Sequence, residues 1–192
     1  MSQRIRRRSV WLSFMVIFSS WLVLYAQHQS WLALAGHALQ AHQPGLYSIN
    51  KFVDGDTVIV NMNGHPETIR FIGIDTAETH KPNTPVQCFG PQAAAYTQQR
   101  IGHQRVQLVS DPLSSDRDRY GRLLRYVYLP DGTDLNLELI QKGYGFYYPY
   151  FPYTKSASFS AAEQTAIANH LGIWAKCHPT PTDSGGYVSN PQ

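Results

Sequence analysis

Charged residues are scarce in this chain. They make up 15% of its 192 residues, and the basic ones are unevenly placed. Residues 1–35 contain no acid but hold four of the sixteen Lys and Arg residues, and this leaves twelve basic and thirteen acidic residues in 36–192, a net charge of −1. The body of the chain therefore lacks the positive field by which many proteins attract nucleic acids or membranes. An anionic ligand would have to be bound by individually placed charges.

Cysteine is rarer still, and Cys88 and Cys177 are the only two. They form no CxxC pair and no Cys/His motif with the spacing of zinc ligands, which argues against a structural zinc site. In an oxidising compartment an even cysteine count favours a disulfide, which here would close a loop of about ninety residues. Two unpaired thiols are the alternative. The hydrophobic content of 43% excludes wholesale disorder.

The N-terminus combines a basic start, at Arg4 to Arg8, with an apolar run over residues 10–26. Ala33 and Ala35 fit the small-residue pattern of a signal-peptide cleavage site. We expect residues 1–35 to be a signal peptide, with an uncleaved membrane anchor over residues 10–26, or a buried core helix, as the alternatives. Both export readings predict a secreted or periplasmic protein, or a membrane-anchored one whose domain lies outside the cytoplasm.

Three further segments follow the N-terminus: a linker at 36–45, one domain at 46–177 and a disordered tail at 178–192, rich in proline and small polar residues. Alternating and β-branched residues predict strands at 46–53, 57–60, 68–74, 106–109 and 123–129. Capping and turn residues predict helices at 90–100, 135–142 and 160–170, the last of which begins with a capping box from Ser160 to Glu163. This order predicts a mainly β fold with α (α+β), a five-stranded OB-fold barrel with about three helices.

The carboxylates of the domain gather at the ends of predicted strands. Asp54 and Asp56 flank a glycine in the first turn, and Asp75 and Glu78 follow the third strand. Carboxylates without lysines nearby suit a hard cation, which prefers oxygen ligands.

Two arginines, Arg70 and Arg122, lie within or beside apolar strands. An arginine is costly to bury unpaired, so each should face a carboxylate or an anionic ligand. Arginines, carboxylates and an oxygen-bound cation together suit phosphodiester hydrolysis. Each feature alone is also common in ordinary turns and structural ion pairs.

Together these residues form motifs that resemble the staphylococcal-type thermonuclease family. The motifs, in the family's order, are VDGDT at 53–57, IRFIGIDTAE at 69–78, FGPQAAAY at 89–96 and DRYGR at 118–122. The resemblance continues through 136–143 and 172–174 and so covers about residues 46–177. It departs from the family at Ala77, where proline is usual.

The resemblance implies a calcium-dependent nuclease that hydrolyses DNA and RNA. Asp56 and Asp75 would bind Ca²⁺ together with the backbone carbonyl of Thr76, and Asp54 would lie behind these ligands, near the metal.

It also implies roles for the remaining motif residues. Glu78 would activate the attacking water, and Arg70 and Arg122 would hold the scissile phosphate and stabilise its developing charge. Arg119 and Tyr120 would contact the nucleotide. All the principal positions are intact, which argues against a catalytically dead relative.

Residues 144–153 form a dense aromatic run. It either packs the core and covers the end of the barrel or provides a platform for stacking bases. Tyr148 and Tyr150 lie nearest the tyrosines that flank the nucleotide in the family, so we expect them to bind substrate.

The sequence thus predicts an exported, calcium-dependent endonuclease with DNA and RNA as substrates. We expect a monomer without a protein partner. The alternative is a non-catalytic nucleic-acid-binding OB module, possibly tethered to a membrane.

Overall fold

The computed structural model describes residues 20–21, 25, 27, 45–79 and 85–191. The chain divides into two units, Met1–Gln43 and Pro44–Gln192, and the second carries the fold considered below. The predicted signal peptide or anchor and the linker lie almost entirely outside the described residues. Among the residues that are described, no helix combines the length and apolar character needed to cross a membrane.

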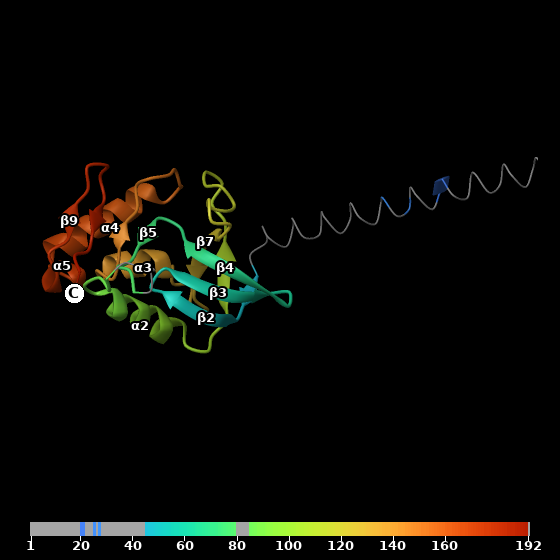
Figure 1. Cartoon of the computed structure of the whole chain (residues 1–192), viewed down its shortest axis with the longest axis horizontal. Coiled ribbons are helices and arrows are strands. Elements are labelled where there is room, and N and C mark those ends of the chain that lie inside the picture. Colours follow the sequence, from blue (N-terminus) through green and yellow to red (C-terminus); the bar gives the residue numbers. More distant parts are fainter. Residues whose placement is uncertain (1–19, 22–24, 26, 28–44, 80–84, 192) are drawn as a thin grey trace, which may run out of the picture. The chain divides into compact units, whose positions relative to one another are not determined.

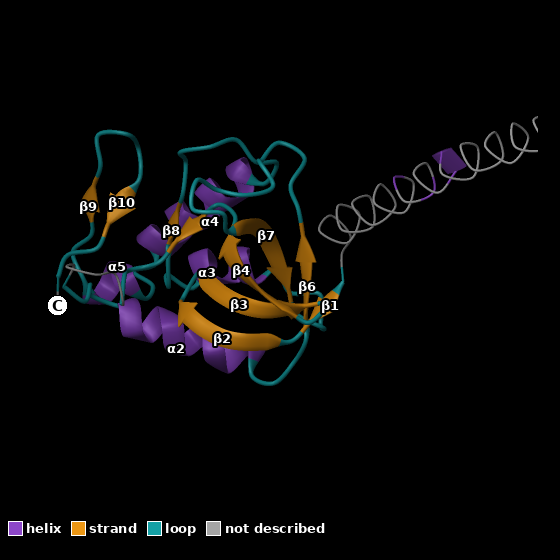
Figure 2. Ribbon diagram, turned by 45° about the vertical axis from the view of Figure 1, so that its right-hand side comes forward, coloured by secondary structure: helices purple, strands orange, loops and turns teal. Residues whose placement is uncertain are grey.

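A curled sheet forms the body of the second unit (Figures 1 and 2). In spatial order its strands are β1 (Leu46–Tyr47), β6 (Val106–Val109), β7 (Leu123–Tyr128), β4 (His65–Phe71), β3 (Thr57–Met62) and β2 (Ile49–Asp54). Only β4 and β7 pair in parallel among these neighbours. A separate antiparallel pair joins β5 (Ile74–Asp75) to β8 (Phe146–Tyr147).

Local sequence explains where the strands turn and break. Asn63 and Gly64 both have positive φ and join β3 to β4, as an Asn-Gly hairpin turn requires. Gly73, also at positive φ, separates β4 from β5, and a Cβ at that position would lie 2.6 Å from the ring of Tyr153. The predicted third strand therefore ends at Phe71 and resumes at Ile74.

Helices α2 (Gly90–Ile101), α3 (Leu135–Gln141) and α4 (Ser156–Ala168) and the short α5 (Ile173–Lys176) pack around this sheet. Pro91 occupies the first turn of α2, and the side chain of Asp134 caps α3 by accepting from the backbone of Leu137. The core combines β-branched and aromatic side chains from the strands with apolar helix faces. The predicted OB-type α+β fold is confirmed.

The start of α4 differs from the prediction. The proposed capping box, Ser160 to Glu163, lies inside the helix, which begins at Ser156 after Lys155. Glu163 is turned into the protein, where it accepts from the backbone N–H of Tyr147 at 2.9 Å, and so it does not cap its own helix.

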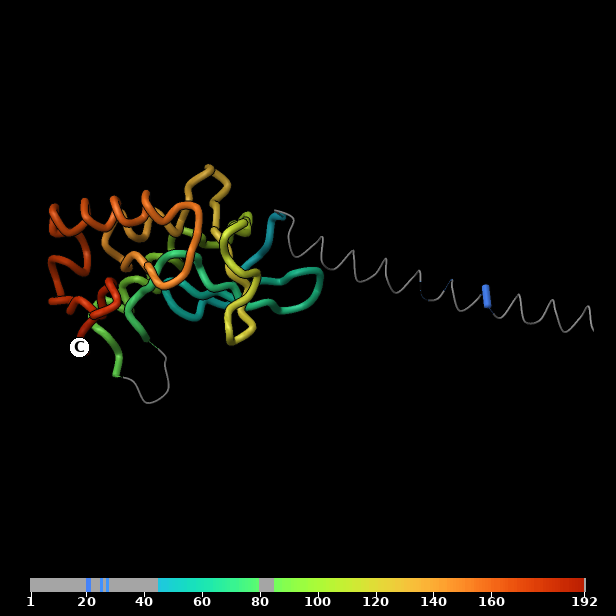
Figure 3. Tube along the Cα trace, turned by 90° about the horizontal axis from the view of Figure 1, so that it is seen from above, coloured from blue at the N-terminus to red at the C-terminus, as the bar shows by residue number. Residues whose placement is uncertain are grey.

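Residues 178–191 differ from the disordered tail that composition predicted. They form a hairpin from β9 (Thr180–Pro181) and β10 (Tyr187–Val188). Tyr187 packs on Trp174 and Phe146, with ring centroids 4.8 and 6.1 Å away. This aromatic contact anchors a segment whose composition is otherwise typical of disorder. In Figure 3 this red segment returns to the green segment that precedes α2.

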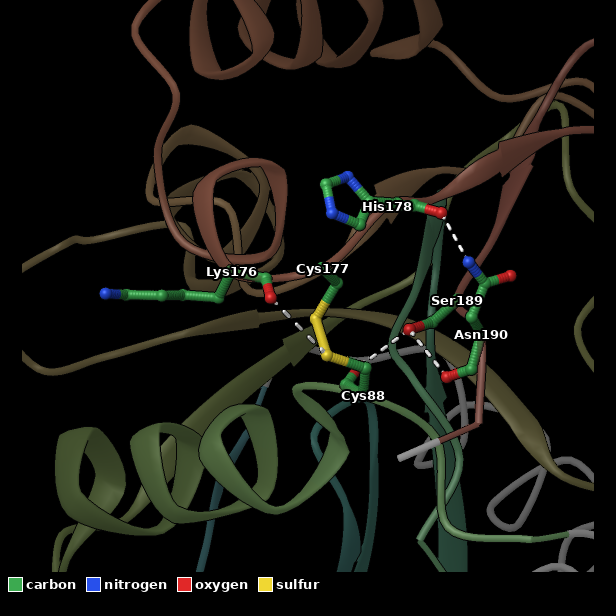
Figure 4. Close-up of a disulfide and its surroundings, with 6 residues drawn as sticks. All are labelled: Cys88, Lys176, Cys177, His178, Ser189 and Asn190. Carbon is green, nitrogen blue, oxygen red and sulfur yellow. Dashed lines mark hydrogen bonds between the residues drawn. A yellow bond between two sulfur atoms is a disulfide. The ribbon is translucent and has the colours of Figure 1, made fainter.

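Cys88 and Cys177 form the predicted disulfide, with their Cα atoms 6.1 Å apart. The bridge joins the residues before α2 to the end of α5, across 89 positions of sequence (Figure 4). Its surroundings come from the hairpin, because Ser189 Oγ donates to the carbonyl of Cys88 at 2.7 Å.

Replacing both cysteines, as Cys88→Ser with Cys177→Ser, should destabilise the protein strongly. Closing a loop of this length lowers the entropy of the unfolded chain and so stabilises the folded protein by about 4–5 kcal/mol. Without the disulfide, the melting temperature should fall by roughly 10 °C or more. Calorimetry of both proteins, with wild type in reducing agent as a third sample, measures the effect. Equal melting temperatures would contradict a stabilising bridge.

Candidate active site

A polar pocket of about 180 Å³ lies where the β2–β3 turn, the end of β4 and the segment after β5 meet. Eight of the sequence-predicted site residues line it: Asp54, Asp56, Arg70, Asp75, Thr76, Glu78, Arg122 and Tyr148. Residues from three separate motifs thus reach one place. The turn and the strand ends bring them together because β3 and β4 pair from Thr57 opposite Arg70 onward.

Asp56 is the buried carboxylate of the pocket, 5% exposed. Its Oδ2 accepts from the backbone N–H and the hydroxyl of Thr76, at 2.7 and 3.1 Å. Its Oδ1 accepts from the hydroxyl of Thr57 at 2.8 Å. These bonds satisfy a buried charge and fix both oxygens.

Arg70 projects from β4 into the same pocket, with its side chain 12% exposed. It donates to Asp75 at 2.6 Å and to the carbonyl of Ile74 at 2.6 Å, and lies 3.3 Å from Asp56. Burial disfavours the charged form, but Asp56 and then Asp75 outweigh it, so the pKa of Arg70 is raised. The guanidinium therefore stays charged beside two carboxylates.

Arg122, at the start of β7, is oriented by Asp118. The side chain of Asp118 accepts from Nε of Arg122 at 2.7 Å and from its backbone N–H at 3.0 Å. Burial of Asp118 works against ionisation, but these bonds from Arg122 prevail and lower the pKa of Asp118. Asp118 was not singled out from sequence, although its i,i+4 spacing to Arg122 is a recognisable signal.

A second cavity of about 350 Å³ adjoins the polar pocket and shares Arg70, Arg122 and Tyr148 with it. Arg119 and Tyr120 line its outer side. Tyr120 is 68% exposed, and the guanidiniums of Arg119 and Arg122 lie 4.8 and 5.4 Å from its ring centroid. Cationic groups and an accessible aromatic face thus lie side by side.

Two ion pairs hold residues 116 and 117, just before Arg119 and Tyr120 in their loop. Arg117 pairs with Glu67 on β4 at 3.0 Å, and Arg125, 1% exposed, pairs with Asp116 at 2.7 Å. A loop fixed in this way presents its aromatic and cationic groups without a large ordering cost on binding.

The aromatic run divides between the core and the site. Phe146 and Tyr153 are buried, whereas Tyr148 lines both cavities. The guanidinium carbon of Arg70 lies over the ring of Tyr148, 5.8 Å from its centroid. Burial, and then the charge of Asp75, raise the pKa of Tyr148. Tyr150 lines neither cavity. It meets Tyr148 edge-on at 4.7 Å, and its hydroxyl pairs with Thr182 in the hairpin at 2.7 Å.

The donor set of the polar pocket fits a hard cation such as calcium. Its oxygens come from Asp54, Asp56, Asp75 and Glu78 and from the backbone at Thr76. No three His, Cys, Asp or Glu side chains within the described parts of the chain are close enough to enclose an ion. An ion here would therefore need backbone, water or substrate oxygens in addition to carboxylates.

Two groups near the site carried no sequence signal. Gln87 donates its backbone N–H to the carbonyl of Glu78 at 2.9 Å and accepts from the N–H of Glu78 through its side chain at 2.8 Å. Glu163 supports β8 from α4 through Tyr147, next to Tyr148. The partners lie nine and sixteen positions apart in sequence, beyond the reach of the local patterns that predict helices and turns.

A curled sheet with OB-type topology that places two arginines beside a cluster of carboxylates is typical of an enzyme that acts on phosphodiesters. The sequence matches the family described as "Staphylococcal nuclease homologue" over residues 68–176. The chain belongs to this family, as its motifs predicted. The matched residues include Arg70, Asp75, Glu78 and Arg122, and the C-terminal hairpin lies beyond them.

Similarity to individual proteins agrees with this assignment. The chain is 38% identical to a Staphylococcus intermedius protein named Thermonuclease over 133 residues, 68% of this chain and 76% of that protein. It is 40% identical to the SPbeta prophage-derived endonuclease YokF of Bacillus subtilis over 74% of this chain and 46% of that protein. The chain is also 37% identical to Endonuclease YncB of the same organism, over 74% of this chain and 64% of that protein.

The buried carboxyl of Glu163 predicts a pH-dependent loss of stability. Burial raises the pKa of Glu163 from 4.5 to about 7, and the carboxyl is only 3% exposed. Because the unfolded chain loses this proton first, stability should fall as the pH rises from about 4.5 to 7. In Glu163→Gln the amide oxygen can still accept from Tyr147, so this variant should be more stable than wild type at pH 8, by about 2–3 kcal/mol.

Urea unfolding at pH 5 and pH 8 tests this expectation. The difference between the two proteins should be small at pH 5 and large at pH 8. Parallel pH profiles for wild type and Glu163→Gln would show that Glu163 does not carry the effect.

Proposed function

We propose that this protein is a calcium-dependent endonuclease that hydrolyses phosphodiester bonds of DNA and RNA outside the cytoplasm. The observation that carries the proposal is the polar pocket, in which Arg70, Arg122 and Glu78 meet three further carboxylates. Membership of a nuclease family and the endonuclease names of its relatives support the same class of reaction.

In this proposal Asp56, Asp75 and the carbonyl of Thr76 hold Ca²⁺. A bound calcium ion would supply positive charge to a phosphate oxygen and help to orient water. Asp56 suits the role because its oxygens are already fixed by Thr57 and Thr76. Asp54, which accepts from the hydroxyl of Thr79, would add negative charge behind these ligands.

Glu78 orients the attacking water and accepts its proton. Arg70 and Arg122 bind the scissile phosphate and stabilise the charge that accumulates as the water oxygen attacks phosphorus and the bond from phosphorus to the leaving sugar oxygen breaks. The leaving oxygen takes up a proton from solvent, which balances the proton that Glu78 accepts. Both arginines are held by carboxylates before substrate arrives, so little reorganisation is needed at the moment of reaction. This preorganisation is the main source of rate enhancement available to such a site.

The second cavity receives the nucleotide next to the scissile phosphate. Arg119 contacts an adjoining phosphate, and Tyr120 and Tyr148 present rings on which an unpaired base can stack. Tyr150 extends this surface beyond the cavity. Stacking needs splayed bases, so single-stranded or frayed substrate is favoured.

Export accounts for the N-terminal sequence and the disulfide together, because disulfides persist in oxidising compartments. We propose residues 1–35 as the signal peptide, with anchoring through residues 10–26 as the alternative, and a monomeric domain without a protein partner. A non-catalytic nucleic-acid-binding module would need the arginines and tyrosines but would have no use for Glu78.

The first test is release of acid-soluble fragments from single-stranded DNA and RNA. Purified protein should release fragments with CaCl₂, and excess chelator should abolish release until calcium is restored. Binding without fragment release under every metal condition would favour the non-catalytic module.

Glu78→Gln should lower kcat by about 10²–10⁴-fold, the contribution typical of a general base. The amide keeps the size of the side chain, so the melting temperature should change little. Single-turnover cleavage under calcium measures the loss. Near-wild-type cleavage would remove Glu78 from the mechanism.

Arg122→Lys should lower kcat by about 10²-fold, because a point charge cannot reproduce the forked donors of a guanidinium. Steady-state kinetics on a short oligonucleotide measures it, with Arg105→Lys, an exposed arginine outside both cavities, as the matched control. Equal losses in the two variants would point to a general effect of replacing arginine rather than to a placed fork.

A further inference from the structure

Glu78 lies on a short irregular segment after β5, and Gln87 forms hydrogen bonds with both its backbone N–H and its backbone carbonyl. The N–H of Glu78 donates to Oε1 of Gln87 at 2.8 Å, and the N–H of Gln87 donates to the carbonyl of Glu78 at 2.9 Å. These two bonds hold the peptide groups on either side of the Glu78 Cα and so fix the position and rotation of the backbone at this residue. The direction in which the Glu78 side chain leaves the backbone is fixed with it.

Helix α2 packs against the same stretch of backbone. A Cβ at Gly90 would lie 2.9 Å from the carbonyl oxygen of Ala77 and 3.0 Å from that of Glu78. The first turn of α2 therefore packs directly on this backbone. Only glycine permits such a close approach.

Gln87 is itself held by the C-terminal hairpin, residues 178–191. It forms an antiparallel bridge with Pro191, and the N–H of the next residue, Cys88, donates to the carbonyl of Asn190 at 2.8 Å. Ser189 Oγ donates to the carbonyl of Cys88 at 2.7 Å, and Asn190 Nδ2 to the carbonyl of His178 at 2.6 Å (Figure 4). The disulfide then ties Cys88 to Cys177, at the root of the hairpin.

A small second core lies next to Glu78 and connects the same parts. Buried Ala77, Phe146, Ile173 and Cys177 form it, and Tyr187 of the hairpin packs against it. Ala77 directly precedes Glu78. The disulfide and the hairpin thus share one packed cluster with the segment that carries Glu78.

We propose that Gln87 is a positioning residue for Glu78, and that the disulfide-tethered hairpin holds Gln87 in its working position. The proposal rests on the role of Glu78 given above. The hairpin lies outside residues 68–176, the part of the chain that matches the family model. Breaking the disulfide would then lower turnover as well as stability.

Gln87→Met tests the first part, because it keeps the volume of the side chain but removes the acceptor for the N–H of Glu78. The value of kcat should fall about tenfold or more, since misplacing a reacting group by about 1 Å costs up to 10²-fold. KM should stay near the wild-type value, because the nucleotide-contacting side chains Arg119 and Tyr120 are untouched. Gln87→Glu keeps an acceptor and should recover most of the loss.

Each protein is assayed in calcium well below its melting temperature, with Gln164→Met, an exposed glutamine on α4, as the matched control. Wild-type kcat in Gln87→Met, or equal losses in Gln87→Met and Gln87→Glu, would overturn the positioning role. A rise in KM without a fall in kcat would also overturn it.

Reduction of the disulfide tests the second part through a double-mutant cycle. Reducing agent should lower kcat of wild type severalfold but change Gln87→Met much less, because both act through one contact. Equal fractional losses in the two proteins would overturn the link from the disulfide through Gln87. Glu78→Gln in the same assay separates the two hypotheses: if it cleaves normally, the proposed function of Glu78 fails, whatever Gln87 does.

Discussion

The pairing of one buried guanidinium with two carboxylates is the interaction on which the rest of the structure depends. Arg70 would be costly to bury alone, and Asp56 and Asp75 offset that cost by pairing with its Nη2 atom. The same side chain donates to the carbonyls of Phe71 and Ile74 and so fixes the break between β4 and β5. The contacts of Arg70 therefore shape the end of β4 and the polar pocket together. A variant that loses Arg70 leaves two carboxylates facing each other in a confined space.

The same arrangement recurs around Arg70, Asp56 and Asp75: a charged side chain is held by an oppositely charged partner before any ligand arrives. Asp118 orients Arg122, Asp116 satisfies the buried Arg125, and Glu67 holds Arg117 at the base of the loop. The proposed reaction requires such groups to be in place before charge develops on the phosphate, because reorientation would consume the energy they supply. Stability and preorganisation thus come from the same contacts. Glu163 is the exception, since its burial favours the protonated form.

Sequence reasoning was accurate where local chemistry decides structure and failed where distant segments meet. The β-branched run of β3, the Asn63-Gly64 turn and Pro91 at the start of α2 each act within a few residues, and their elements lie where they were predicted. The pocket residues could be named because their motifs resemble a known family, and the structure brings eight of them together. The start of α4 was wrong because Glu163 binds Tyr147 instead of capping its helix. The ordered hairpin and the contacts of Gln87 depend on the packing of Tyr187 and on hydrogen bonds between residues 189–190 and Cys88, which neither composition nor local pattern reveals.

The low net charge of the domain follows from the same principle. A strongly basic surface would attract nucleic acid anywhere along it, and the affinity would depend steeply on salt. Here the carboxylates that hold Arg70 and Arg122 cancel their long-range field, so the arginines act only on a phosphate close enough to compete for their donors. Cations bound to these carboxylates would weaken their attraction for the arginines and so favour binding of the arginines to the phosphate. In the proposed enzyme, metal dependence would arise from charge placement as well as from the chemistry of the ion, because the carboxylates would bind both the metal and the arginines.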